Sequence, residues 1–292
     1  MFEDILLPVD GSAGADAAVG HAADIADRFD ATVHVLFVAS TNRDSVTVVG
    51  GDVVDALESE GEGIVDPVAD DVRARGVDCD SEVVQGDPAA TIAEYADSRG
   101  MDLVVMATQG RTGLSRYLLG SVTEKVVRLA GTPVLTIRTH EEARTSFPYE
   151  NVVVPTDGSE AASAAADRGA DFAAAVDATL HAVSVVEEAS LGFDVRSASV
   201  SDELEAIAED AIADVAATAA DAGVENVREE LLRGRVHRAI LDYAADNDAD
   251  LLVMGTRGRG GTDRILLGSV AERIVRTSPV PVLTVPDPGD GD

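Results

Sequence analysis

Short apolar runs alternate along the chain with longer segments in which apolar residues recur at helical spacing. The run from Ile5 to Val9 precedes an Ala-rich segment, Ala13 to Phe29, and the β-branched run Thr32 to Val38 comes next. Buried strands that alternate with amphipathic helices predict an α/β fold with a parallel sheet covered on both faces. In the same half we predict the further helices Val53–Arg75, Pro88–Ser98 and Gly120–Leu129 and the further strands Glu82–Val84, Leu103–Met106 and Val134–Ile137. Inside the first of these helices, Pro67 predicts an interruption or a kink.

The whole pattern occurs twice. Leu-Leu-Gly-Ser-Val at Leu118 returns unchanged at Leu266, a shift of 148 residues (118 to 266). The opening Pro-Val-Asp-Gly-Ser at Pro8 returns as Pro-Thr-Asp-Gly-Ser at Pro155. A period this long predicts two copies of one domain and not a solenoid, whose repeats are much shorter. We therefore predict domains over residues 1–140 and 147–286, followed by a disordered acidic tail over 287–292. The strands of the second domain are expected to begin at about Asn151, Thr179, Val227, Leu251 and Val282.

Composition narrows the class of protein. Hydrophobic residues make up 46% of the chain, enough for real cores, whereas aromatic residues make up only 3%. The formal net charge is −32, which disfavours nucleic acid or an anionic membrane as partner. An acid-rich surface with a single lysine suits a salty cytoplasm, where screening relieves self-repulsion, so we expect a halophilic source. Since neither a signal peptide nor a long uncharged run is visible, we expect a cytoplasmic protein.

Familiar catalytic sets are missing from the sequence. There is no Walker A pattern, no Gly-x-Ser-x-Gly and no His-Glu-x-x-His. The single cysteine, Cys79, excludes an internal disulfide and a thiolate cluster. The five histidines are not at metal-ligand spacing, and His34 and His181 occupy matching strand positions, which favours packing. We therefore expect no metal centre made by side chains and no catalytic residues.

Two loops in each half carry the candidate chemistry. In open parallel sheets, ligands bind beyond the carboxyl ends of the strands, where the strand order reverses. The loop at Asp10 and the loop from Gly110 to Ser121 both follow predicted strands, as do the loop at Asp157 and the loop from Gly255 to Ser269. Glycines allow close approach to a ligand, and a helix N-terminus offers N–H groups to anions. These features favour a phosphate-binding site.

A structural reading of the same residues stays open. Asp10 and Asp157 are typical of Asx turns, and Ser12 and Ser159 are typical of helix N-caps. The arginines are compatible with solvated surface charges. Their clustering favours an anion site instead, and in the second half the clustered residues are Arg257, Arg259, Arg264, Arg273 and Arg276.

At these residues the chain resembles the universal stress protein family in its tandem form. Nucleotide-binding members carry Gly, two residues, Gly, nine residues, Gly and then Ser or Thr. The second half matches that motif fully, at Gly255, Gly258, Gly268 and Ser269. The first half has Gly110, Gly120 and Ser121, but Ala107 stands where the first glycine is expected. The resemblance extends from about Phe2 to Pro286.

The resemblance implies a Rossmann-like, adenine-nucleotide alpha-hydrolase-like fold in each half, with a five-stranded parallel sheet of order 3-2-1-4-5. It implies ATP, or ADP or AMP, held between the first-strand and fourth-strand loops, with Mg²⁺ or another divalent cation on the phosphates. Asp10 and Asp157 would then meet adenine or ribose, and Val38 and Val185 would touch the adenine. The motif glycines and Ser121 or Ser269 would hold ribose and phosphates. The fifth strands of the two halves are expected to pair as a pseudo-dimer, which could pair again as a homodimer.

Ala107 is the departure from the motif. If the backbone there needs a positive φ, the added Cβ costs about 1 kcal/mol, so we expect a weakened first site. The leading functional prediction is an ATP-binding stress-response protein with a regulatory role. The alternatives are a slow ATPase, for which only Asp10 or Asp157 is a candidate base, and a nucleotide-free protein-interaction module.

Overall fold

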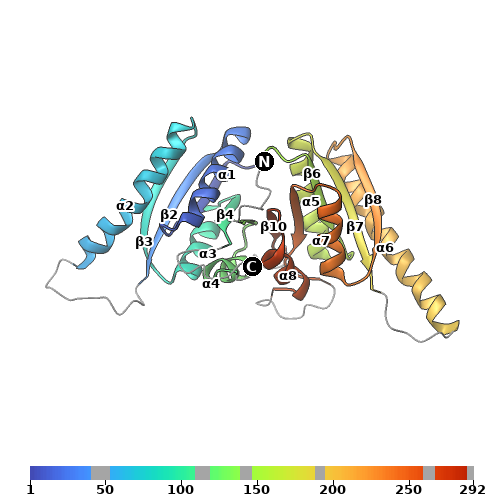
Figure 1. The fold of residues 1–292 in the computed structure, drawn as a ribbon. Coiled ribbons are helices and arrows are strands. Elements are labelled where there is room, and N and C mark those ends of the chain that lie inside the picture. Colours follow the sequence, from blue (N-terminus) through green and yellow to red (C-terminus); the bar gives the residue numbers. More distant parts are fainter. Residues whose placement is uncertain (41–52, 109–118, 139–146, 188–194, 259–266, 288–292) are drawn as a thin grey trace. The chain divides into compact units, whose positions relative to one another are not determined.

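The computed structural model describes residues 1–40, 53–108, 119–138, 147–187, 195–258 and 267–287. These residues fall into two compact units, Met1–Phe147 and Pro148–Asp292. Each unit is an α/β domain in which apolar strands are covered by helices (Figure 1). Among the described residues, no helix is long and apolar enough to cross a membrane.

The first unit has one parallel sheet among its described residues. Its neighbouring strands pair in the order β3-β2-β1-β4-β5, every pair parallel. The predicted order 3-2-1-4-5 is therefore confirmed. The strands are β1 (Asp4–Pro8), β2 (Thr32–Ser40), β3 (Cys79–Gly86), β4 (Leu103–Ala107) and β5 (Val134–Ile137). The helices are α1 (Ala13–Phe29), α2 (Val53–Ala74), α3 (Pro88–Arg99) and α4 (Ser121–Leu129).

The second unit repeats this topology. Its strands pair in the order β10-β9-β6-β7-β8, again all parallel. The strands are β6 (Asn151–Pro155), β7 (Thr179–Val186), β8 (Val227–Arg233), β9 (Leu251–Gly255) and β10 (Val282–Val285). The helices are α5 (Glu160–Ala175), α6 (Val195–Asp221), α7 (Val236–Asp246) and α8 (Ser269–Thr277).

Local sequence accounts for the helix ends. The Asp87 side chain caps α3 by accepting a hydrogen bond from the Ala90 N–H at 3.2 Å, and Pro88 occupies the first turn, where no N–H is needed. Gly100 ends the same helix at φ +69°, a conformation that L side chains rarely adopt. Helix α2 continues through Pro67, so of the two predicted effects of this proline the interruption is wrong and the kink stays a prediction.

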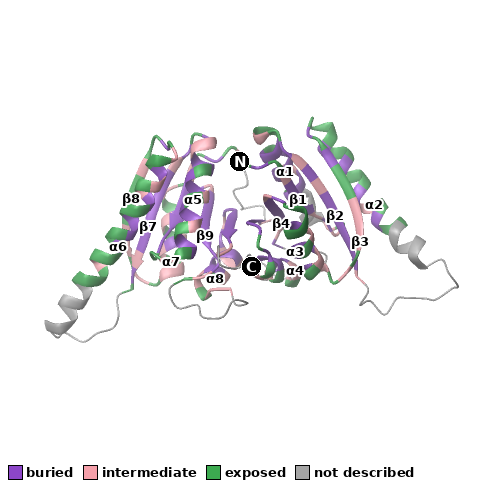
Figure 2. Ribbon diagram, turned by 180° about the vertical axis from the view of Figure 1, so that it is seen from behind, coloured by how far each residue is buried: buried purple, intermediate pink, exposed green. Residues whose placement is uncertain are grey.

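The core of each unit lies between the sheet and its helices. The central strands are almost wholly buried, as the purple strands of Figure 2 show, and Leu6 and Val153 have no exposed surface. Helices α1 and α5 present alanines such as Ala22 and Ala165 to the sheet, both without exposed surface. Because alanine is small, these helices lie close to the strands that they cover. In each unit two helices contact one another on each face of the sheet: α1 with α2 and α3 with α4, then α5 with α6 and α7 with α8.

Each sheet reverses its strand order between two central neighbours, a place that we call the switch point. In the first unit the chain moves outward from β1 to β2 and β3, then returns to β4 on the other side of β1. Strands β6 and β9 are the corresponding neighbours in the second unit. The loops that follow these strands therefore leave adjacent positions at one edge of each sheet.

Candidate functional site

In the second unit, the two loops at the switch point start from buried threonines. Thr156 follows β6 and donates its backbone N–H to the Val183 carbonyl of β7 at 2.8 Å. Thr256 follows β9 and donates its backbone N–H to the Val285 carbonyl of β10 at 3.0 Å. Both threonines are buried. The neighbouring strands thus hold the first residue of each loop before the chain reaches the surface.

The Asp157 loop is a tight turn that leads directly into α5. The Ser159 N–H donates to Oδ1 of Asp157 at 3.0 Å, which is an Asx turn. Gly158 has φ +71°, and its N–H donates to the Thr156 hydroxyl at 3.1 Å. The Ser159 hydroxyl accepts from the Ala162 N–H at 3.3 Å, as an N-cap does. The predicted structural roles of Asp157 and Ser159 are confirmed, and they leave Oδ2 of Asp157 outside the turn.

The other loop meets this aspartate at Gly258. A Cβ on Gly258 would lie 2.6 Å from Oδ2 of Asp157, so any side chain at this position would have to displace the carboxylate. The two candidate loops, which are about a hundred residues apart in the chain, are therefore in contact at the predicted site.

Gly255 is required by a second close approach. A Cβ there would lie 2.6 Å from the carbonyl oxygen of Ala161 and 3.0 Å from its Cβ, in the first turn of α5. Gly255 is the last residue of β9 and is not among the glycines with positive φ. Ala107, its counterpart, ends β4 and has no positive φ either. The backbone strain that we expected at Ala107 is therefore not present.

The third glycine begins α8. Gly268 is the N-cap at φ −60° and ψ 143°, and no side chain caps the helix. Its N–H donates to the Thr256 carbonyl at 2.8 Å, and a Cβ on Gly268 would lie 3.2 Å from that oxygen. Ser269 follows as the first, exposed residue of α8. The positive end of the helix dipole is thereby held beside the start of the glycine loop.

The first unit has the same backbone arrangement. Gly11 has φ +71°, and the Ser12 N–H donates to Oδ1 of Asp10 at 3.0 Å. Gly120 is the N-cap of α4 at φ −59° and ψ 137°, and its N–H donates to the Thr108 carbonyl at 2.7 Å. Ser121 is the first residue of α4. Gly110, with Arg111 and Arg116, lies outside the described residues.

Two hydroxyl groups distinguish the first unit from the second. Ser12 occupies the predicted N-cap position of α1, but its hydroxyl makes no capping bond. The Oγ of Ser12 and the Oγ1 of Thr108 are both buried and have no hydrogen-bond partner among the residues that the structure describes. Buried polar atoms are nearly always paired, so these two hydroxyls are groups that a bound ligand with polar atoms would satisfy.

The two valines lie on the strands beside the aspartate loops. Leu36 accepts the Val9 N–H at 2.9 Å, and β2 continues past it to Ser40, which carries Val38 beyond the end of β1. Val185 occupies the same place on β7, two residues past Val183. Val38 is 8% exposed, whereas Val185 is half-buried. Their contact with adenine stays a prediction.

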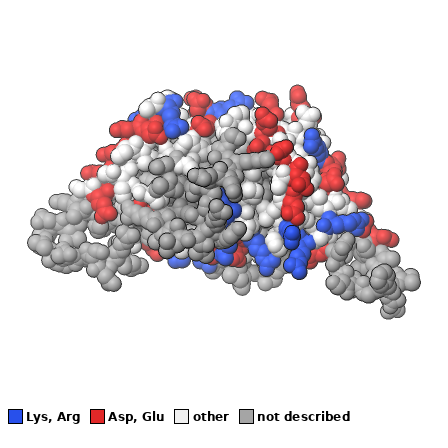
Figure 3. Space-filling view, viewed as in Figure 1, with Lys and Arg blue, Asp and Glu red and all other residues white. Residues whose placement is uncertain are grey.

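Part of the predicted arginine cluster is engaged by carboxylates. Arg257, only 11% exposed, lies 3.7 Å from Oδ2 of Asp287, so the first residue of the predicted tail contacts the glycine loop. Arg276 pairs with Glu272 one turn earlier at 3.0 Å. Arg259 and Arg264 lie outside the described residues. Figure 3 shows basic side chains gathered over α7 and α8, which carry Arg238, Arg273 and Arg276.

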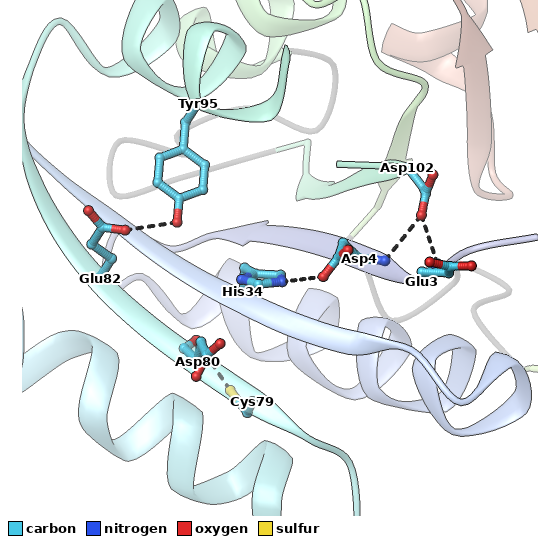
Figure 4. Close-up of polar contacts among 8 residues, drawn as sticks. All are labelled: Glu3, Asp4, His34, Cys79, Asp80, Glu82, Tyr95 and Asp102. Atoms are coloured by element: carbon cyan, nitrogen blue, oxygen red, sulfur yellow. Dashed lines mark hydrogen bonds and ion pairs between the residues drawn. The ribbon is translucent and has the colours of Figure 1, made fainter. Parts of the chain in front are cut away.

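The histidines of β2 and β7 belong to the opposite edge of each sheet. In the first unit, Nε2 of His34 lies 2.6 Å from Oδ1 of Asp4, at the start of β1 (Figure 4). Asp102 accepts the backbone N–H groups of Glu3 and Asp4 at 2.7 and 3.1 Å. Tyr95 donates to Glu82 at 2.9 Å, and burial, followed by this bond, raises the pKa of Tyr95 to about 12.

In the second unit the matching histidine is fully buried. His181 lies between Oδ1 of Asn151, 3.2 Å from Nε2, and the Tyr243 hydroxyl, 3.0 Å from Nδ1. Burial, and secondly the charge of Arg228, lowers the pKa of His181 to about 4. The packing role predicted for both histidines agrees with these contacts.

Sequence reasoning missed the residues that brace the loops. Thr156 and Thr256 precede the motifs and were not predicted as site residues, although a threonine directly after an apolar run can be recognised in the sequence. The contact made by Ala161 could not be predicted, because this residue is one of several similar alanines at the start of α5. Asp287 was expected in the acidic tail. Its ion pair with Arg257 could not be predicted, because the pair forms only where β9 and β10 are neighbours in the sheet.

Comparison with known proteins places the chain. The model of the Universal stress protein family matches residues 1–138 and again residues 148–286. Universal stress protein MJ0531 of Methanocaldococcus jannaschii is 36% identical over 141 residues, which cover 47% of this chain and 83% of that protein. Universal stress protein Rv2005c of Mycobacterium tuberculosis is 33% identical over 207 residues, which cover 70% of this chain and 67% of that protein.

A solved structure agrees over nearly the full length. The universal stress protein from Archaeoglobus fulgidus aligns with a TM-score of 0.73 and 24% identity. The alignment covers 97% of this chain and 98% of that one, and at this identity it supports the fold. The matched domain occurs twice, in both halves of the chain, and the protein belongs to the universal stress protein family in its tandem two-domain form.

Proposed function

We propose that the protein binds an adenine nucleotide, ATP or its products ADP and AMP, at the switch point of the second unit and acts as a regulatory stress-response protein. The observation that carries the proposal is the approach of Gly258 to Asp157, where a Cβ would lie 2.6 Å from the carboxylate oxygen. In support of the proposal, this contact brings the glycine loop next to an acidic side chain whose oxygens can accept hydrogen bonds from a base or ribose.

The uncapped start of α8 is the element suited to phosphates. Its first N–H groups have no partner within the helix, and the helix dipole favours negative charge at this end. Gly268 holds that end beside Thr256 through the 2.8 Å backbone bond. Ser269 adds a hydroxyl at the same position. Together these groups would bind phosphate oxygens without needing a lysine.

A divalent cation would accompany the phosphates and not a side-chain cage. Among the described residues, no group of three His, Cys, Asp or Glu side chains is arranged to hold a metal ion. Mg²⁺ is commonly held by one or two carboxylates, substrate phosphates and water. In this site the carboxylate of Asp157 and the hydroxyl of Ser269 are oxygen donors that would suit such an ion.

Isothermal titration calorimetry of the full chain with ATP, ADP and AMP tests the proposal, together with acid release of copurified nucleotide. Gly258→Ala is expected to weaken binding about tenfold or more, because its Cβ needs the place of the Asp157 carboxylate. Gly63→Ala is the matched control, since Gly63 lies in α2 with nothing within 4 Å of an added Cβ. A chain that binds none of the three nucleotides would overturn the proposal, as would equal affinities of the two variants.

The same preparation separates binding from hydrolysis. Under this proposal the bound nucleotide is a regulatory ligand, so turnover is expected to stay negligible on the timescale of binding. Phosphate release that Asp157→Asn abolishes would instead support the slow ATPase.

We also propose how the chain assembles. From the family resemblance we expect the β5 and β10 strands to pair, and the chain to associate further as a homodimer. Sedimentation equilibrium in high salt reports the second association directly, and a strictly monomeric chain would contradict it.

A further inference from the structure

Thr156, the residue before Asp157, is held at all three of its polar groups. Its backbone N–H donates to the Val183 carbonyl of β7 at 2.8 Å. Its carbonyl accepts the hydroxyl of Ser184, the next residue of β7, also at 2.8 Å. Its own hydroxyl accepts the N–H of Gly158 at 3.1 Å, which is an ST turn. Two consecutive residues of β7 thus hold the residue from which the aspartate loop starts.

The bond from Ser184 lies inside the protein. Ser184 is 5% exposed, and Thr156 is 8% exposed. A buried carbonyl that loses its partner cannot turn to water instead, so this bond is costly to break. The Thr156 carbonyl is therefore fixed against β7.

The orientation of Thr156 passes directly to Asp157. The carbonyl carbon of Thr156 is bonded to the nitrogen of Asp157, so a fixed peptide plane sets the direction in which the aspartate leaves the strand. The ST turn of Thr156 and the Asx turn that follows it overlap, because their donors, Gly158 and Ser159, are consecutive residues. The Asx turn uses Oδ1 of Asp157, and Oδ2 lies on the side of Gly258.

The first unit cannot make these side-chain bonds. The shift between the two Asp-Gly-Ser loops is 147 residues (10 to 157), which places Val9 at the position of Thr156. The same shift places Phe37 at the position of Ser184, and the Phe37 ring lies toward α2, where a Cβ on Gly61 would be 3.0 Å from its Cδ1. The backbone N–H of Val9 still bonds to β2 at 2.9 Å. The fold therefore does not need the hydroxyl pair of the second unit.

From these observations we infer that Ser184 is a positioning residue of the proposed nucleotide site, because its bond to Thr156 fixes the Asp157 carboxylate where a base or ribose would bind. The inference rests on the proposed function and adds to it a residue that lies outside the glycine motif. Ser184 acts through Thr156 and is not itself a ligand contact. The bond also holds the aspartate loop of the second unit more firmly than that of the first.

Ser184→Ala in the full chain tests the inference, with Ser278→Ala as the matched control. Ser278 is another buried serine of the second unit, and its hydroxyl also donates to a backbone carbonyl at 2.8 Å, that of Val280. This serine lies between α8 and β10, outside both loops of the site. Calorimetry with ATP is expected to show about three- to tenfold weaker binding for Ser184→Ala and unchanged binding for Ser278→Ala.

Amide hydrogen exchange, read by NMR without nucleotide, reports the position of the loop by itself. Exchange at Gly158 and Ser159 is expected to be faster in Ser184→Ala and unchanged in Ser278→Ala. Ser184→Thr keeps a hydroxyl on the same carbon, so it is expected to restore slow exchange and ATP affinity together.

Three results would overturn the inference and leave the proposed function standing. They are an unchanged ATP affinity in Ser184→Ala, an equal loss of affinity in Ser278→Ala, and slow exchange in Ser184→Thr without recovery of the affinity. A wild-type chain that binds no nucleotide would instead overturn the proposed function and the inference with it, whatever the exchange rates.

Discussion

Protonation of His181 sets an acid limit on the stability of the second unit. The neutral ring protonated at Nε2 satisfies both neighbours, since it donates to Asn151 and accepts the Tyr243 hydroxyl proton at Nδ1. A second proton would remove that acceptor and place a charge in a fully buried site. Burial accordingly lowers the pKa of His181 to about 4 from the ordinary value of 6.5.

The sign and size of the effect follow from linkage. Between pH 6.5 and about pH 4 the unfolded chain holds a proton on this histidine and the folded chain does not, so stability falls as the pH falls through that window. Each pH unit well inside the window costs up to ~1.4 kcal/mol. Lowering the pH from 7 to 5 therefore removes about 2 kcal/mol, and below pH 4 this histidine contributes no further loss.

The assay compares wild type, His181→Gln and the matched first-unit variant His34→Gln at pH 7, 6 and 5, in constant high salt. Hydrogen exchange read by mass spectrometry on peptides of the second unit gives its free energy of unfolding. The stability difference between wild type and His181→Gln is expected to shrink by about 2 kcal/mol over this range. His34→Gln should leave the pH dependence of the second-unit peptides as in wild type, because the change lies in β2 of the first unit. If His181→Gln lost stability with pH as steeply as wild type, the reasoning would be refuted.

Asp287→Asn is expected to tighten nucleotide binding about threefold, because Arg257 would lose its carboxylate partner and turn to the phosphates. Arg257→Gln, which introduces the residue found at that position in the first half, should weaken binding. If calorimetry gave weaker binding for both variants, the ion pair between Arg257 and Asp287 would instead hold the loop in its binding position. Asp250→Asn is expected to cost about 1–2 kcal/mol, since Asp250 accepts two backbone N–H groups at 2.9 Å, and Asp102→Asn should cost the same in the first unit, as read from denaturant midpoints. With a net charge of −32, the free energy of unfolding should rise between low and molar salt, and a flat dependence would contradict the halophilic interpretation.

Hydrophobic periodicity was sufficient for elements that bury one clear face. It predicted α1 and β5 with their observed bounds, because apolar residues define both ends of each element. It made β3 too short, since this strand runs from Cys79 to Gly86 and exposes polar residues such as Asp80. The pairing of β3 along β2, and not an apolar pattern, sets its length.

At the site, the sequence predicted which loops matter but not why each glycine is needed. A side chain at position 255 would collide with the first turn of α5, and a side chain at position 258 would collide with the carboxylate of Asp157. Both reasons depend on which segments come into contact in the folded chain, so the spacing of the motif alone could not reveal them.

A single backbone hydrogen bond closes each glycine loop. The chain leaves the stem after Thr256 and returns at Gly268, whose N–H binds the Thr256 carbonyl at 2.8 Å, while the Thr256 N–H is bound to β10. Thr108 and Gly120 form the same stem in the first unit. Since only backbone groups make these closing bonds, the closure does not depend on which side chains the loops carry, and doubling a loop's length costs only about 0.6 kcal/mol of closure entropy. Transplanting the second loop between Thr108 and Gly120 is therefore expected to leave the closing bond of the first unit intact.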